Sequence, residues 1–340
     1  MNPLISFAVP LYNKGEKIAG VIASIHHLCR SLDNRYEICI SDNCSNDLKE
    51  GIVEHLAARN ILANCRISRL EVTISVEDNW LYALGMCSAP IVKLQLADDT
   101  LCDFDLQFVL SKFEDTRLSF VVGKSRPVVE SIDNQEICRL KSYYENVNLD
   151  RRNIFSSCDP KSFLRSVTPK ALFSGANQFG DINALIMRRE CVDHLREPIF
   201  HSAFPALLCW PDWEFYTKLA LAFSGDIVDE FISDFVYLAA SPHQRAAVDP
   251  TYKRRVYSDI EATIRMSPLI NPDLRRLLAA QLSKPERDRL LLIAMRQLLI
   301  NADSSWPALF NSLVNQRIGA AVHRVKQVLK ETLLRQKPKD

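Results

Sequence analysis

Two adjacent carboxylates, Asp98 and Asp99, follow a mainly apolar stretch of the chain. That run covers residues 90–96, in which Lys93 and Gln95 are the polar exceptions, and a second run with apolar residues begins at Leu101. Neighbouring Asp side chains repel one another, and a divalent cation at the end of a buried strand relieves that repulsion. Hard oxygen ligands of this kind suit Mg²⁺ or Mn²⁺. A solvated turn or a helix cap is the alternative interpretation of the pair alone.

Three strand-like segments each end in polar, turn-forming residues. Residues 5–9 and 36–41 are runs of β-forming residues, and turns follow them at residues 10–13 and 42–47. The third segment is the run over residues 90–96 in front of the Asp pair. Ligands of an open α/β sheet bind at the carboxyl ends of its strands, so we expect the three turns to converge on one site.

The alternation of strand-like and helix-like segments predicts an α/β fold with a mainly parallel sheet flanked by helices. After the first strand, apolar residues recur at helical spacing, namely Ile18, Val21, Ile22, Ile25, Leu28 and Leu32. Further helices are expected over residues 48–58, 78–87 and 213–223, and further strands over residues 67–76, 91–96, 118–122 and 227–238. We interpret the less regular residues 126–180 as strands with inserted loops.

Composition argues against several classes of protein. Only nine glycines are present, and neither a Gly-x-Gly-x-x-Gly nor a Walker sequence occurs, so a dinucleotide fold and a P-loop are not expected. The formal net charge of +1 gives no reason to expect a nucleic-acid partner. The ten cysteines form no Cys-x-x-Cys pair and no signal-peptide pattern is present, which favours a cytoplasmic protein. No apolar stretch approaches the ~18 residues that span a bilayer.

Four motifs, in this order, resemble those of the inverting family 2 glycosyltransferases, which have the GT-A (Rossmann-like) fold. They are Val9-Pro10-Leu11-Tyr12-Asn13, the loop Asp42-Asn43-Cys44-Ser45-Asn46-Asp47, Ala97-Asp98-Asp99 after Asn79, and Trp210-Pro211-Asp212-Trp213-Glu214 at a helix start. The similarity extends over roughly residues 4–245. It implies an enzyme that uses a nucleotide sugar, with UDP as the expected nucleotide and Mn²⁺ or Mg²⁺ as the expected cofactor.

The resemblance assigns nucleotide contacts to Pro10, Tyr12, Asp42, Asn43 and Asn79. Asp42 would accept the imino hydrogen of uracil, and the ring of Tyr12 would face the base. The residues alone allow other roles. Asp42 can form an Asx-turn that caps a helix from Asp47, Asn13 can be the N-cap of a plain strand-to-helix turn, and Asn79 can be an ordinary surface residue.

The resemblance also assigns residues to metal binding, to the general base and to contacts with the diphosphate. Asp98 is the first choice for a metal ligand, and Asp99 is either a second ligand or a contact to the ribose or sugar. Asp212 is the expected general base, with Glu214 as a second candidate; a simple N-cap supported by Glu214 is the alternative. His243 and Arg245 would reach the metal or the diphosphate, although an exposed loop His is equally compatible with the sequence.

The leading interpretation is an inverting glycosyltransferase that acts on a glycan or lipid-linked acceptor in bacterial surface polysaccharide synthesis. Leu96, Thr100 and Pro211 stand where the family often has acids. These departures support an alternative, a non-catalytic protein of the same fold that binds a nucleotide sugar or a glycan. A nucleotidyltransferase is a third option, but Lys14-Gly15 is too little to form its Gly-rich basic loop.

We predict a catalytic domain over residues 1–248 and an α-helical, basic region over residues 249–340. The nucleotide-binding half of the domain is placed at about 1–100 and the acceptor half at about 101–248. Residues 251–340 contain 17 Lys or Arg against 8 Asp or Glu. An amphipathic pattern near the C-terminus predicts a helix that packs its apolar face on the domain or, alternatively, binds an anionic surface at the inner face of the plasma membrane.

Overall fold

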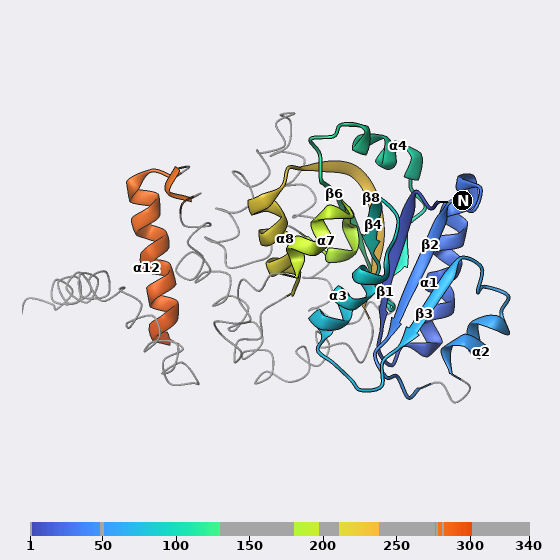
Figure 1. Ribbon diagram of the computed structural model, residues 1–340. Coiled ribbons are helices and arrows are strands. Elements are labelled where there is room, and N and C mark those ends of the chain that lie inside the picture. Colours follow the sequence, from blue (N-terminus) through green and yellow to red (C-terminus); the bar gives the residue numbers. More distant parts are fainter. Residues whose placement is uncertain are drawn as a thin grey trace, which may run out of the picture.

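The computed structural model describes residues 2–47, 51–129, 180–196, 211–237, 276, 278–280 and 282–300. Within these residues the strands form one eight-stranded sheet in the order β3-β2-β1-β4-β7-β6-β8-β5 (Figure 1). The strands are β1 (Ile5–Leu11), β2 (Tyr36–Asp42), β3 (Cys65–Arg69), β4 (Ile91–Leu94), β5 (Thr100–Leu101), β6 (Phe120–Val129), β7 (Leu185–Arg188) and β8 (Gly225–Tyr237). The predicted α/β class is confirmed.

The four strands β3, β2, β1 and β4 are parallel to one another, and β6 is parallel to β8. Strand β7 is antiparallel to both β4 and β6, and the short β5 is antiparallel to β8. The sheet is therefore mainly parallel, as predicted, with antiparallel strands inserted after β4. Strand β1 is buried along its whole length, which is typical of a parallel strand covered on both faces.

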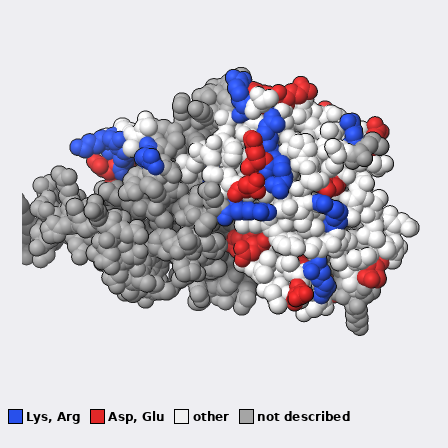
Figure 2. Space-filling model, in the orientation of Figure 1, with Lys and Arg blue, Asp and Glu red and all other residues white. Residues whose placement is uncertain are grey.

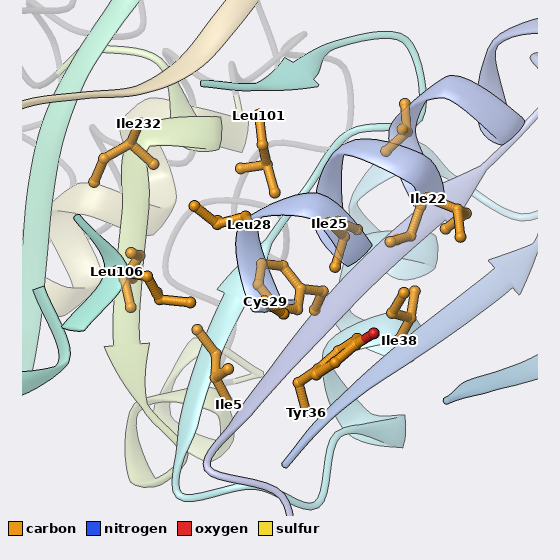
Figure 3. Close-up of a cluster of buried hydrophobic side chains, with 14 of the residues drawn as sticks. Ile5, Ile22, Ile25, Leu28, Cys29, Tyr36, Ile38, Leu101, Leu106 and Ile232 are labelled. Atoms are coloured by element: carbon orange, nitrogen blue, oxygen red, sulfur yellow. The ribbon is translucent and has the colours of Figure 1, made fainter. Parts of the chain in front are cut away.

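Helices cover both faces of the sheet. Successive residues of a strand point to opposite faces, so a strand that is apolar at nearly every position needs cover on both faces. The described helices are α1 (Gly15–Leu28), α2 (Ile52–Ala57), α3 (Val76–Met86), α4 (Leu106–Ser111), α7 (Glu190–Leu195), α8 (Pro211–Ala222) and α12 (Lys284–Ile300), with 3₁₀ turns η1 (Cys29–Leu32), η2 (Lys112–Glu114) and η3 (Ile182–Ala184). One apolar cluster joins α1, α2 and α4 to the sheet (Figure 3). A second cluster joins α3, α7 and α8 to the other face.

Helix α1 has the apolar face that the sequence predicts. Ile18, Val21, Ile22, Ile25 and Leu28 are all buried in the first cluster, and Leu32 continues that face in η1. Burying each such side chain contributes about 1.5–3 kcal/mol, so this face holds the helix on the sheet. Asn13 is not the N-cap: that position is Lys14, which makes no side-chain cap.

Several predicted boundaries move. The strand predicted over residues 67–76 lies at Cys65–Arg69, and Val76 begins α3 because Oγ of Ser75 accepts from the backbone N–H of Asp78 at 3.0 Å. Helix α2 begins at Ile52. Strand β6 extends to Val129, well beyond the predicted end at residue 122.

Several predicted features lie outside the described residues. They are most of the region 126–180, the boundary at 248/249, His243, Arg245 and the C-terminal amphipathic segment. Within the described residues, no helix combines the length and apolar character needed to cross a membrane. On the face seen in Figure 2, basic and acidic side chains lie next to each other in mixed groups.

Candidate active site

The turns after β1 and β2 are joined by hydrogen bonds into one platform. The backbone N–H of Asn13 donates to Oγ of Ser45 at 3.0 Å, and Oδ1 of Asn13 accepts from the N–H of Asn46 at 3.0 Å. The N–H of Gly15 donates to Oδ2 of Asp47 at 2.6 Å. Asn13 has φ 49°, a left-handed conformation that Asn tolerates better than most residues. The platform holds the start of α1 against the β2 turn.

Tyr12 and Pro10 have different positions in this platform. The side chain of Tyr12 is 48% exposed, so its ring can form one wall of a base pocket. Pro10 is buried within β1, where it pairs in register with Ser41 of β2. Pro10 therefore acts through the strand that leads into the turn, and the contact predicted between Pro10 and a nucleotide stays a prediction.

Asp42 is completely buried at the end of β2 and has two partners. Its Oδ1 accepts from the backbone N–H of Ser45, three residues further along the chain, at 2.9 Å, so the carboxylate closes this turn. Its Oδ2 lies 2.9 Å from Nη1 of Arg69, whose side chain is 48% exposed. Arg69 ends β3 and also donates to the carbonyl of Ser45. The exposed part of the guanidinium brings a positive charge to the mouth of this turn.

Two buried amides connect the turns to neighbouring segments. Oδ1 of Asn43 accepts from the N–H of Ile74 at 2.8 Å, and its Nδ2 donates to the carbonyl of the same residue at 3.0 Å. Oδ1 of Asn79, on α3, accepts from the hydroxyl of Ser41 at 2.5 Å. Both amides therefore position the strand ends. Their predicted contacts with a nucleotide stay predictions.

The two carboxylates of the Asp pair have opposite environments. Oδ2 of Asp98 lies 3.2 Å from Nζ of Lys14, and these side chains are 33% and 32% exposed. Asp99 is buried, and its Oδ2 accepts from Nδ2 of Asn183 at 2.5 Å. In the sequence no basic residue stands beside the pair, but the fold brings Lys14 to it from the β1–α1 turn. Only Asp98 of the two presents its carboxylate at an accessible position.

A buried lysine lies beneath this turn. Nζ of Lys93, in β4, donates to the carbonyl of Asn183 at 2.5 Å, to Oε1 of Gln95 at 3.1 Å and to the carbonyl of Leu94 at 3.2 Å. Desolvation lowers the pKa of Lys93 to about 7, although the nearby Asp181 and Asp99 oppose the shift. A buried amine normally needs such partners, because an isolated charge in the interior is costly.

Asp212 is the second residue of α8. The residue is only partly buried, but its carboxyl group is poorly solvated, and this desolvation raises the pKa of Asp212 to about 8. The negative charge of Asp181 adds to the increase, and hydrogen bonds from the backbone N–H groups of Asp212 and Ile182 oppose it. A carboxylate with a pKa near neutrality is suited to accept a proton from a hydroxyl group.

Sequence reasoning did not single out Lys14 as a partner of Asp98, and it missed Arg69, Lys93, Asp181 and Asn183. Arg69 is the last residue of the strand next to β2. Knowledge of the strand order alone could have placed it near Asp42. The other three are buried polar residues whose partners come from distant segments. His243 and Arg245 lie outside the described residues, and the side chain of Glu214 does too.

The fit of a divalent cation depends on Asp98. Among the described residues, no group of three or more His, Cys, Asp or Glu side chains could hold a metal ion. Mg²⁺ and Mn²⁺ sites in phosphate-transfer enzymes need only one or two carboxylates, because substrate oxygens and water supply the other ligands. Asp98 meets this requirement, whereas Asp99 is occupied by Asn183.

The parallel half-sheet, its strand-end turns and the helices on both faces define a GT-A type α/β protein. Residues 6–170 match the sequence profile of glycosyl transferase family 2. None of the curated protein sequences matches the chain.

Solved structures share the fold. TarS residues 1–349 from S. aureus, in complex with UDP-GlcNAc, has a TM-score of 0.53 and 18% identity, covering 87% of this chain and 72% of that chain. The mannosyltransferase PcManGT from Pyrobaculum calidifontis, in complex with GDP-Man and Mn²⁺, has a TM-score of 0.50 and 15% identity, covering 96% and 88%. At these identities the similarity establishes the fold.

Proposed function

We propose that the protein is an inverting glycosyltransferase that transfers a sugar from a UDP-linked donor to a hydroxyl group of a glycan or lipid-linked acceptor. The observation that carries the proposal is the position of Asp212, in the first turn of α8, in a chain that matches glycosyl transferase family 2. Desolvation raises the pKa of this carboxyl group, which suits it to act as a base. A second observation supports the donor side, where Tyr12, Asp42 and Arg69 surround one turn.

In this proposal the nucleotide lies at the ends of β1 and β2. The exposed ring of Tyr12 stacks on the base, and the Asp42–Arg69 pair supplies hydrogen-bond acceptors and donors at its edge. The similarity to structures that contain UDP-GlcNAc and GDP-Man supports a nucleotide sugar as the donor class. UDP is our choice because the family resemblance implies an Asp at the position of Asp42 that contacts uracil.

The transfer requires a base and a stabilised leaving group. Asp212 takes the proton of the acceptor hydroxyl as the oxygen attacks the anomeric carbon, and the bond to the diphosphate breaks on the opposite face. Asp98 is the residue that would hold Mn²⁺ or Mg²⁺. A bound cation supplies charge neutralisation to the departing diphosphate. Lys14 adds a second positive charge beside Asp98.

A thermal-shift screen of nucleotide sugars with and without Mn²⁺, followed by a turnover assay, tests the proposal. A ligand that binds only the native state raises the melting temperature. We expect UDP-linked sugars to raise it and to be consumed when an acceptor is present. Stabilisation without any turnover in the presence of acceptor mixtures would instead indicate a nucleotide-sugar binding protein.

The acceptor side of the proposal rests on the C-terminal region. The excess of basic residues over residues 251–340 supports reversible attachment to an anionic inner membrane, where lipid-linked acceptors for surface polysaccharides are found. Co-sedimentation with anionic and neutral liposomes at low and high salt tests this part. Binding to anionic vesicles that disappears at high salt is expected; absence of binding at low salt contradicts it.

A further inference from the structure

Asn183, the middle residue of η3, is completely buried and uses all its polar groups. Its N–H donates to Oδ1 of Asp181 at 2.9 Å, and its carbonyl accepts from Nζ of Lys93 at 2.5 Å. Its side chain accepts from the N–H of Leu96 at 2.7 Å and donates to Oδ2 of Asp99 at 2.5 Å. One residue therefore fixes both the backbone before the Asp pair and the carboxylate of Asp99.

The same turn holds the start of α8. The carboxyl group of Asp212 receives a hydrogen bond from the backbone N–H of Ile182, the neighbour of Asn183. One turn further along α8, the hydroxyl of Tyr216 donates to the carbonyl of Asp181 at 2.8 Å. Helix α8 is thus attached to η3 at two points, and η3 is attached to the Asp pair through Asn183.

We propose that Asn183 is a positioning residue for sugar transfer, which holds the donor-side Asp99 and the base Asp212 in one rigid unit. The inference rests on the proposed function for the roles of these two carboxylates. Their separation must be accurate, since a misplacement of about 1 Å in a reacting group can cost ~10² in rate. An amide suits the position because its oxygen accepts from Leu96 while its nitrogen donates to Asp99.

The test uses Asn183→Ala, Asn183→Asp and a matched control in the full chain. Asn183→Asp keeps an oxygen for the N–H of Leu96 but places a carboxylate against Asp99. If Asn183 only supports the backbone, the activity of this variant stays close to that of the parent. If Asn183 positions Asp99, the activity falls. The control is Ser6→Ala, which removes two hydrogen bonds, with Glu37 and Ala89, at the amino end of β1, away from the strand ends that carry the site.

Two readouts are measured: hydrogen exchange in the first turns of α8, and release of UDP from UDP-GlcNAc. In the protein without nucleotide, we expect exchange over residues 215–219 to rise about tenfold in both Asn183 variants and to stay unchanged in Ser6→Ala. We expect kcat to fall ~10²-fold in both variants, with KM for the donor within about fivefold.

The outcomes test the positioning role of Asn183 and the proposed donor separately. If either Asn183 variant matches Ser6→Ala in both exchange and kcat, Asn183 is not a positioning residue. If the parent protein neither binds UDP nor releases it from UDP-GlcNAc, the proposed donor is wrong, and the exchange measurement without nucleotide still decides whether Asn183 holds α8. Melting temperatures of all variants identify any that fail to fold, and Asn183→Asp then carries the comparison if Asn183→Ala is lost.

Discussion

Nζ of Lys14 lies 3.2 Å from Oδ2 of Asp98, although 84 positions separate the two residues in the chain. The ammonium group therefore stands beside the carboxylate that is our proposed metal ligand. A divalent cation that binds Asp98 before the nucleotide has to compete with Lys14. Once a diphosphate is bound, the same ammonium group can turn towards the phosphate oxygens, because a lysine is a flexible point charge.

The first prediction follows from this competition. Lys14→Met removes the competing charge, so we expect the affinity of Mn²⁺ for the nucleotide-free protein to rise about two- to fivefold, the range of an exposed ion pair. Calorimetry or the electron-spin signal of free Mn²⁺ measures this change. Lys112→Met is the matched control, since Nζ of Lys112 forms a similar surface pair with Asp226 at 3.7 Å. Unchanged or weaker Mn²⁺ binding in Lys14→Met would show that the pair does not compete.

The second prediction concerns the metal itself. We expect UDP to bind more tightly with Mn²⁺ than with a chelator, and we expect this difference to disappear in Asp98→Asn. The reason is that a diphosphate needs positive charge, and Lys14 alone provides only part of it. Calorimetry of UDP binding under both conditions measures the effect. Equal affinity in the parent protein with and without Mn²⁺ rules out the metal role of Asp98.

The third prediction tests the base pocket. Asp42→Asn keeps an oxygen for the N–H of Ser45 but removes the charge that pairs with Arg69. Hydrogen bonds to charged groups contribute about 1.5–3 kcal/mol, so we expect UDP affinity to fall ~10-fold or more. Arg66→Met, which removes the pair between another arginine of β3 and the largely buried Glu37, is the control. If Asp42→Asn binds UDP as the parent does, the pair only stabilises the turn.

The parts of the fold predicted from the sequence are those with a strong periodic pattern. The apolar runs of β1 and β2 and the helical face of α1 depend on local order, and the structure confirms them. The strand predicted over residues 67–76 was wrong beyond Arg69, because Ser75 caps α3 and capping outweighs the β-forming residues before it. The β-forming residues alone do not reveal that a helix begins here, and the Ser75 cap has to be considered with them.

The site was less predictable than the fold, because its essential contacts join distant segments. The sequence places Asp98 and Asp99 side by side, yet the fold directs one to Lys14 and the other to Asn183. Motifs can identify which strand ends carry acids. Asp99 is held by Asn183 of η3, and this element lies more than 80 residues further along the chain.

The fourth prediction is the pH dependence of Asp212. Its folded-state pKa of about 8 is raised from 3.8, so the folded protein holds this proton more tightly than the unfolded chain does. Stability from this group is therefore present below pH 4 and is lost as the pH rises towards 8. We expect Asp212→Asn to be more stable than the parent in urea unfolding, by a margin that grows from pH 5 to pH 8. A margin that does not change with pH contradicts the raised pKa.

The same pKa governs the rate. A base must be deprotonated, so we expect kcat/KM for the acceptor to increase about tenfold per pH unit below 8 and to level off above it.

Asp212→Asn should lower transfer ~10² to 10⁴-fold while UDP affinity changes only a few-fold, because the donor contacts come from other turns. Asp105→Asn is the control, since Asp105 also begins a helix and accepts from the N–H of Phe108 at 2.9 Å. If Asp212→Asn transfers sugar at nearly the parental rate, Asp212 is only a helix cap, and Glu214 becomes the next candidate for the base.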